Sequence, residues 1–131
     1  MPLEDRLRHF AAEWLQRAKS NLARAKQPKP AEVFWEDYCF DAQQAAEKAV
    51  KAVLTVRGID FPKSHDIAEL LLLLAPADVS DDLWSAERLT QYAVVTRYPG
   101  WKPPVSEEEC GQAVTLAEQV VRWAERIVHG G

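Results

Sequence analysis

The sequence predicts an all-α protein, and three observations support this prediction. Apolar residues recur at steps of three and four along most of the chain, which is the spacing of one helix face. Prolines and glycines stand between these stretches, where helices tend to end. No segment of useful length alternates apolar and polar residues as a half-buried strand does. The predicted architecture is a bundle of four long helices plus one short helix.

The first two long helices are predicted at 3–26 and 31–57. The apolar stripe of the first helix consists of Leu7, Phe10, Ala11, Trp14, Ala18, Leu22 and Ala25. Its solvated side is expected to include Arg6, Glu13, Arg17 and Arg24. Pro28 and Pro30 end this helix because proline cannot continue the helical hydrogen bonds. The second helix has an alanine-rich middle, which favours helix and close packing, and Gly58 is placed just after its C-cap.

Three further helices are predicted at 64–75, 80–97 and 106–130. Ser64 is the expected N-cap of the short one, and its five consecutive leucines are expected to be buried on most faces. Ser106 and Glu109 match the capping-box pattern at the start of the last helix.

Composition indicates one soluble domain spanning 1–131. Sixteen Lys and Arg against twenty Asp and Glu leave a net charge of −4, which argues against coating nucleic acid through bulk charge but permits a local basic patch. Cys39 and Cys110 lie far apart in the sequence, outside any paired motif, and are expected to be reduced, partly buried thiols. The first ten residues lack an apolar signal region and the longest apolar run is short, so a cytoplasmic location is expected.

No metal site and no cofactor are predicted. His9, His65 and His129 are too scattered for a metal-binding motif. Glycine-rich phosphate loops, a nucleophile elbow and the Glu-x-x-His pairs of di-iron bundles are absent from the sequence.

The most informative candidate site lies on the second predicted helix. Gln44, Lys48 and Lys51 stand at i, i+4 and i+7, so they form one polar stripe. An amide and two ammonium groups on one face suit an anion such as a phosphate or a nucleic-acid backbone. The alternative is a solvated face on which Glu47 and Lys51 form an ordinary i,i+4 ion pair.

A second candidate lies at the start of the short helix. His65, near a helix N-terminus, could bind phosphate or act as a general acid or base. Its alternative role is structural, in helix capping or in a hydrogen bond to a neighbouring loop. Asp66 fits the preference of the first helical turn for acidic residues.

The third candidate follows the fourth predicted helix. Arg97 offers a rigid fork for phosphate, and Tyr98 and Trp101 can stack on a base. Alternatively, Arg97 binds the carbonyls at the helix end while the two aromatic residues anchor the loop to the bundle.

Three segments together resemble a known family. They are AAEWLQRAKSNLARA (11–25), FDAQQAAEKAVKAVLTVRGIDFPKSHDIAELL (40–71) and LTQYAVVTRYP (89–99). The combination resembles the HEPN (higher eukaryotes and prokaryotes nucleotide-binding) domain family over about residues 5 to 128. The resemblance implies an up-and-down helical bundle that commonly forms homodimers. It also implies a minimal nucleotidyltransferase partner, in a toxin–antitoxin or nucleotide-handling pair.

The same resemblance suggests which residues surround a nucleotide or phosphate. Gln44 and Lys48 match the QQAxEK block of the family, with Lys51 one turn further on. His65 matches the histidine after the second helix, and Arg97 with Tyr98 match the RYP segment.

Around the RYP segment, the sequence departs from the ribonuclease members of the family. Ribonuclease members carry an R-x4-6-H motif, whereas neither Arg88 nor Arg97 is followed by a histidine at that spacing. The leading hypothesis is therefore a nucleotide- or polynucleotide-phosphate-binding protein rather than an enzyme. Two alternatives are kept. One is a divergent, metal-independent ribonuclease toxin that uses His65 and Arg97, and the other is a helical scaffold with no ligand site.

Overall fold

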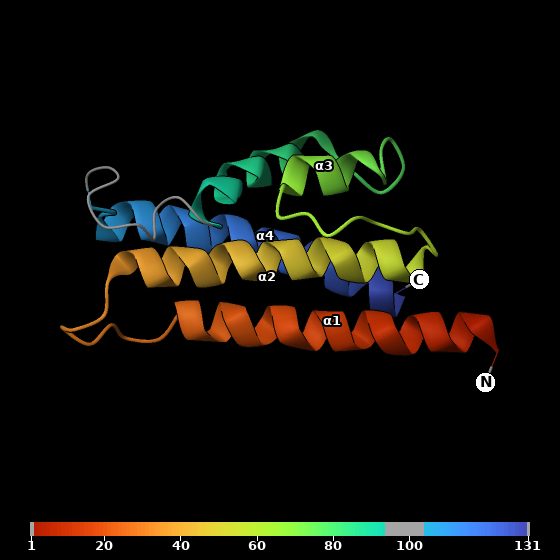
Figure 1. Cartoon of the computed structure of the whole chain (residues 1–131), viewed down its shortest axis with the longest axis horizontal. Coiled ribbons are helices and arrows are strands. Elements are labelled where there is room, and N and C mark those ends of the chain that lie inside the picture. The colour runs from red at the N-terminus through yellow and green to blue at the C-terminus, as the bar shows by residue number, and fades with distance from the viewer. Residues whose placement is uncertain (1, 94–103, 131) are drawn as a thin grey trace.

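Three long α-helices form the body of the fold, as Figure 1 shows. They are α1 (Leu3–Ala25), α2 (Trp35–Val56) and α4 (Glu107–Gly130), in a computed structural model that describes residues 2–93 and 104–130. α1 runs antiparallel to α2, and α4 runs in the same direction as α2. Ion pairs from Lys19 to Glu125 and from Lys26 to Glu118 join α1 to α4 in the antiparallel sense.

Two shorter helices return along the side of α2 and α4 that faces away from α1. They are the α-helix α3 (Ile67–Leu72) and the 3₁₀ helix η1 (Asp81–Tyr92). Together they lead the chain from the end of α2 back towards the start of α4, in the direction opposite to that of the two long helices. The all-α prediction is confirmed, with five helices and no strand in the part of the chain that the structure describes.

The core is centred on α2, which packs against all four other helices. Almost every residue of α2 between Tyr38 and Leu54 is buried as a result. Its many alanines allow close approach of neighbouring helices, and larger side chains such as Leu15, Leu70 and Val120 fill the space around it. The polar residues Gln43, Glu47 and Lys51 in the middle of α2 are therefore buried among neighbouring side chains.

The end of α2 is formed as the sequence predicts. Gly58 has a φ of 72°, the left-handed conformation that glycine adopts without strain. The N–H of Ile59 donates to the carbonyl of Leu54 at 2.9 Å, and that of Gly58 donates to the carbonyl of Thr55 at 3.0 Å. These two bonds define a Schellman motif, which turns the chain towards α3.

The start of α4 follows half of the predicted capping box. The backbone N–H of Glu109 donates to Oγ of Ser106 at 3.0 Å. The Glu109 carboxylate accepts a hydrogen bond from the Tyr92 hydroxyl at 2.5 Å, which ties η1 to α4.

The short helix differs from its prediction in two ways. Its N-cap is Asp66 rather than Ser64, because the Asp66 carboxylate accepts the hydrogen bond from the backbone N–H of Glu69. The five leucines are not buried on most faces. Leu70, Leu71 and Leu74 are in the core, whereas Leu72 and Leu73 are 65% and 40% exposed. A helix of six residues lies on one side of the bundle, so only one of its faces meets the core.

The helix predicted at 80–97 is a 3₁₀ helix over the part that the structure describes. Its buried residues are Leu83, Ala86, Leu89 and Tyr92, which are spaced by three. A 3₁₀ helix has three residues per turn, so this spacing puts all four on one face towards α2 and α4. This spacing of three is present in the sequence and distinguishes a 3₁₀ helix from an α-helix.

Candidate functional site

Two residues of the predicted stripe on α2, Gln44 and Lys51, belong to a polar network around the buried carboxylate of Glu47. Nζ of Lys51 lies 2.8 Å from Oε2 of Glu47, and Nε2 of Gln43 donates to Oε1 of the same carboxylate at 2.8 Å. Gln44 extends the network by donating to Oε1 of Gln43 at 2.6 Å. The ion pair of Glu47 and Lys51 that the sequence suggested is present, but it lies in the interior rather than on a solvated face.

Aromatic rings cover the Lys51 ammonium group. Nζ lies 5.5 Å from the ring centroid of Trp14 on α1 and 5.8 Å from that of Phe61 in the loop before α3. The two rings meet edge to face, with their centroids 6.3 Å apart. Cation–π attraction and the ion pair with Glu47 together compensate for the burial of this charge.

His65 joins this network from the loop before α3. Its Nδ1 atom lies 2.9 Å from Oε1 of Glu47, while 65% of its side chain is exposed. Burial alone would raise the pKa of Glu47, but hydrogen bonds from Lys51, Gln43 and His65 outweigh it and lower the pKa. The ionised carboxylate only accepts hydrogen bonds, so Nδ1 of His65 is the donor.

A second network joins α2 to α1. The Asp41 carboxylate is buried and accepts hydrogen bonds from Asn21 at 3.0 Å and from Arg24 at 2.8 Å. Nζ of Lys48 donates to Oδ1 of Asn21 at 2.8 Å. The side chain of Lys48 is thereby positioned at the junction of α1 and α2.

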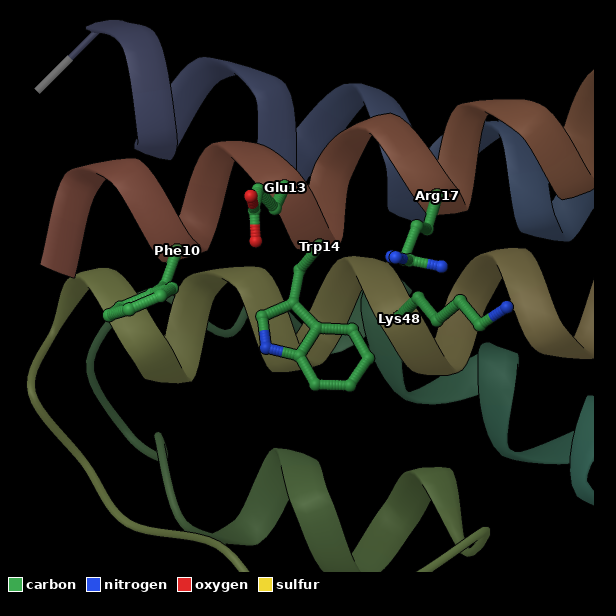
Figure 2. Close-up of a pocket in the computed structure, with 5 residues that line it drawn as sticks. All are labelled: Phe10, Glu13, Trp14, Arg17 and Lys48. Carbon is green, nitrogen blue, oxygen red and sulfur yellow. The ribbon is translucent and has the colours of Figure 1, made fainter. Parts of the chain in front are cut away.

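Lys48 also lines an open pocket of about 420 Å³ between α1 and α2. The other lining residues come from one face of α1 and are Phe10, Glu13, Trp14 and Arg17. In Figure 2 the Arg17 guanidinium and the Lys48 side chain lie next to each other on one side of Trp14, and Phe10 lies on the other. The volume is within the range of about 300–1,000 Å³ that is common for small-molecule sites.

The electrostatics of the pocket favour an anion. Two cations and one carboxylate line it. Burial is the main reason why the pKa of Lys48 is lowered; the charge of Glu47 opposes this shift, and the positive charges of Arg17 and Arg24 add to it. An anion placed between Arg17 and Lys48 would relieve this repulsion.

The structure brings together three of the six residues predicted to bind a ligand and describes a fourth at a separate place. Gln44, Lys51 and His65 belong to the network around Glu47, whereas Lys48 lines the pocket. The other two, Arg97 and Tyr98, lie outside the described residues.

Four pocket residues on α1 were not among the predicted site residues. Phe10 and Trp14 were assigned to the apolar stripe, and Glu13 and Arg17 to the solvated side. The available signal was their spacing at 10, 13, 14 and 17, which puts two rings and two charges on one helix face.

The two cysteines contact each other in the core. Cys39 on α2 and Cys110 on α4 are free thiols and both are buried, more completely than the sequence suggested. A hydrogen bond to Cys110, with burial, raises the pKa of the Cys39 thiol.

Among residues 2–93 and 104–130, no three His, Cys, Asp or Glu side chains are grouped closely enough to hold a metal ion. Within the same ranges, every helix is too short or too polar to cross a membrane.

Comparisons with known proteins agree with this architecture. The model of the HEPN domain matches residues 11–127. The protein TT1696 from Thermus thermophilus has 34% identity and a TM-score of 0.78, with 89% of this chain and 97% of that chain covered. ST0689, an archaeal HEPN homologue, has 26% identity and a TM-score of 0.73, with 90% and 97% covered. No curated protein matches the chain. The match over residues 11–127 and the two solved structures establish that this chain belongs to the HEPN domain family.

Proposed function

We propose that this protein binds the phosphate of a nucleotide or a polynucleotide in the pocket between α1 and α2. The observation that carries the proposal is that Arg17 and Lys48 line one pocket with the Trp14 ring. Arginine and lysine are the side chains that bind phosphate best, and an indole ring offers a surface on which a base can stack.

The residues around Glu47 have a positioning role in this proposal. Lys51 is committed to its ion pair and lies against Trp14, so it holds the indole in place. Gln44 and His65 stabilise the same network from either side. Arg97 and Tyr98 stay predicted ligand contacts.

Calorimetric titration tests the proposal directly. The ligands are the ribonucleoside monophosphates, the matching nucleosides without phosphate, and a short single-stranded RNA. We expect the monophosphates and the RNA to bind, and the nucleosides to bind at least about tenfold more weakly, because they lack the charged group.

Variants locate the binding site. Arg17→Ala and Lys48→Ala should each weaken binding of the monophosphates by about tenfold or more. Arg8→Ala is the matched control, because Arg8 is an exposed cation on the same helix and does not line this pocket. Failure of every phosphate ligand to bind, or equal loss in the control, would contradict the proposal.

One observation favours a second candidate function, the divergent ribonuclease. The carboxylate of Glu47 accepts from Nδ1 of His65 and so leaves the lone pair of Nε2 on an exposed ring. A carboxylate that orients an imidazole in this way is the arrangement of a general base. Incubation of RNA with the purified protein and with His65→Ala tests it. Cleavage that is absent, or equal in both proteins, removes His65 from any catalytic role.

We also propose that the chain forms a homodimer and acts with a minimal nucleotidyltransferase, as a toxin–antitoxin-like pair in the cytoplasm. The support is the resemblance of the QQAAEK block and the exposure of large apolar residues, which are Leu3, Phe10, Phe34, Leu72 and Leu73. Light scattering on the protein, alone and mixed with such a purified enzyme, should give a dimer and a larger complex. A monomer at micromolar concentration would contradict the homodimer, and the absence of a larger complex in the mixture would contradict the partnership with the nucleotidyltransferase.

A further inference from the structure

Among the described residues, Glu13 is the one acidic residue that lines the pocket of Arg17 and Lys48. Its Oε1 atom lies 3.5 Å from Nε2 of His9, and both side chains are more than half exposed. In Figure 2 the carboxylate lies above Trp14 and Phe10, on the side away from the Lys48 ammonium group. A ligand that entered the pocket would therefore meet a hydrogen-bond acceptor beside the rings and cations at the other end.

A carboxylate at this place repels a phosphate, so it contributes to binding only if another part of the ligand donates hydrogen bonds to it. An ionised carboxylate has two oxygens and no donor, and it pairs best with two N–H groups that lie side by side. Among the four RNA bases, guanine presents such a pair on its Watson–Crick edge, at N1 and at the 2-amino group. Adenine and cytosine place a ring nitrogen acceptor beside their amino group, and uracil places its single N–H between two carbonyls.

Resting on the proposed function, we infer that this pocket is specific for guanine nucleotides. The Glu13 carboxylate accepts hydrogen bonds from N1 and the 2-amino group, and the guanine ring stacks on Trp14. Arg17 and Lys48 bind the phosphate. Phe10, which is 50% exposed, lines the outer part of the base site.

The spacing along α1 suits this division of the pocket. Glu13 and Trp14 are neighbours in the sequence, and Arg17 follows Glu13 by four residues, which is about 6 Å along the helix axis. Both ends of the pocket, the one with Glu13 and the one with Arg17, are therefore on one face of α1. Lys51 beneath Trp14 keeps the ring in its orientation.

The test is calorimetric titration of the full chain with GMP, AMP, CMP, UMP and IMP, whose base keeps the N1–H but lacks the 2-amino group. We expect GMP to bind about tenfold or more tightly than AMP, CMP and UMP, with IMP in between. In Glu13→Gln the GMP affinity should fall to that of the other nucleotides, whose affinities should stay equal or rise, because a negative charge near the phosphate has been removed. Glu13→Asp keeps the carboxylate but shortens the side chain by one methylene group, so it should lose part of the preference for GMP.

Glu4→Gln is the matched control, because it removes an exposed carboxylate of the same helix outside the pocket. It should leave the preference for GMP unchanged. Equal binding of all five nucleotides would overturn the guanine assignment and leave the phosphate-binding function standing. A GMP preference that survives in Glu13→Gln would overturn the role of Glu13. If no nucleotide binds, the proposed function itself fails.

Discussion

Nζ of Lys51 lies 2.8 Å from Oε2 of Glu47, and these two side chains are only 10% and 4% exposed. An ion pair at i and i+4 is usually a surface feature worth a few tenths of a kcal/mol. Here Trp14 and Phe61 cover the Lys51 ammonium group, so loss of the Glu47 charge leaves Lys51 without an ionic partner in the interior. We therefore expect this pair to contribute to the stability of α2 and to the position of the Trp14 ring.

The first prediction concerns the stability of the ion pair. Glu47→Gln should lower the free energy of unfolding by about 3 kcal/mol, because it leaves the Lys51 charge buried and unpaired. Glu125→Gln removes a carboxylate from the exposed pair with Lys19 and should cost less than about 1 kcal/mol. Urea unfolding followed by circular dichroism measures both. Similar small losses in the two variants would contradict the structural role of Glu47.

The second prediction is the pH dependence of that difference. The folded protein lowers the pKa of Glu47 below the ordinary value of 4.5, so its stabilising effect is complete above that pH and is lost as the pH falls through the folded-state pKa. The gap in unfolding free energy between the wild type and Glu47→Gln should be full at pH 7 and should narrow below about pH 4.5. A gap that stays constant down to pH 3 would mean that Glu47 titrates alike in the folded and unfolded protein.

The third prediction uses the lowered pKa of Lys48. A nucleotide phosphate is fully ionised above about pH 7, so a further change in AMP affinity reports on the protein. Lysine with a lowered pKa begins to lose its proton below its ordinary value of 10.5, and AMP binding should weaken as the pH rises from 7 towards 10. Lys48→Arg should bind AMP with a flatter profile, because arginine stays charged. If AMP affinity depends on pH in the same way in the wild type and in Lys48→Arg, direct contact between Lys48 and the phosphate is contradicted.

The fourth prediction compares two glycines. Gly58→Ala should destabilise the protein by about 1 kcal/mol, because its φ of 72° is strained for any residue with a Cβ atom. Gly111→Ala should stabilise it by about 0.5–1 kcal/mol, because Gly111 lies within α4 and a Cβ there meets nothing within 4 Å. Thermal unfolding of both variants checks the opposite signs. Two shifts of the same sign would show that one of these backbone assignments is wrong.

Much of the fold was predictable from local pattern. The ends of α2 and α4 follow from Gly58 and Ser106, because helix caps depend on hydrogen bonds within a few residues. The N-cap at Asp66 was missed because Ser64 and Asp66 are both good caps, and their choice depends on where the loop from α2 meets the bundle.

The candidate site was predictable in part. The polar stripe on the second helix identifies Lys48. On the first helix, however, the helical spacing assigns Arg17 to the solvated side and Trp14 to the apolar stripe. The pocket exists only where α1 and α2 meet, and the helical period of one segment contains no information about which face of another segment lies opposite.

The sequence by itself determined the helices, most of their ends, and the polar stripe on α2, because these depend on residue spacing and on local hydrogen bonds. Only the tertiary structure decided what surrounds each side chain of that stripe. It buried Lys51 against Glu47, left His65 at the surface, and placed Lys48 beside Arg17 at an open pocket. The physical reason is that burial and charge pairing depend on residues distant in sequence, and the same ammonium group is solvated, paired or available to a ligand according to what packs over it.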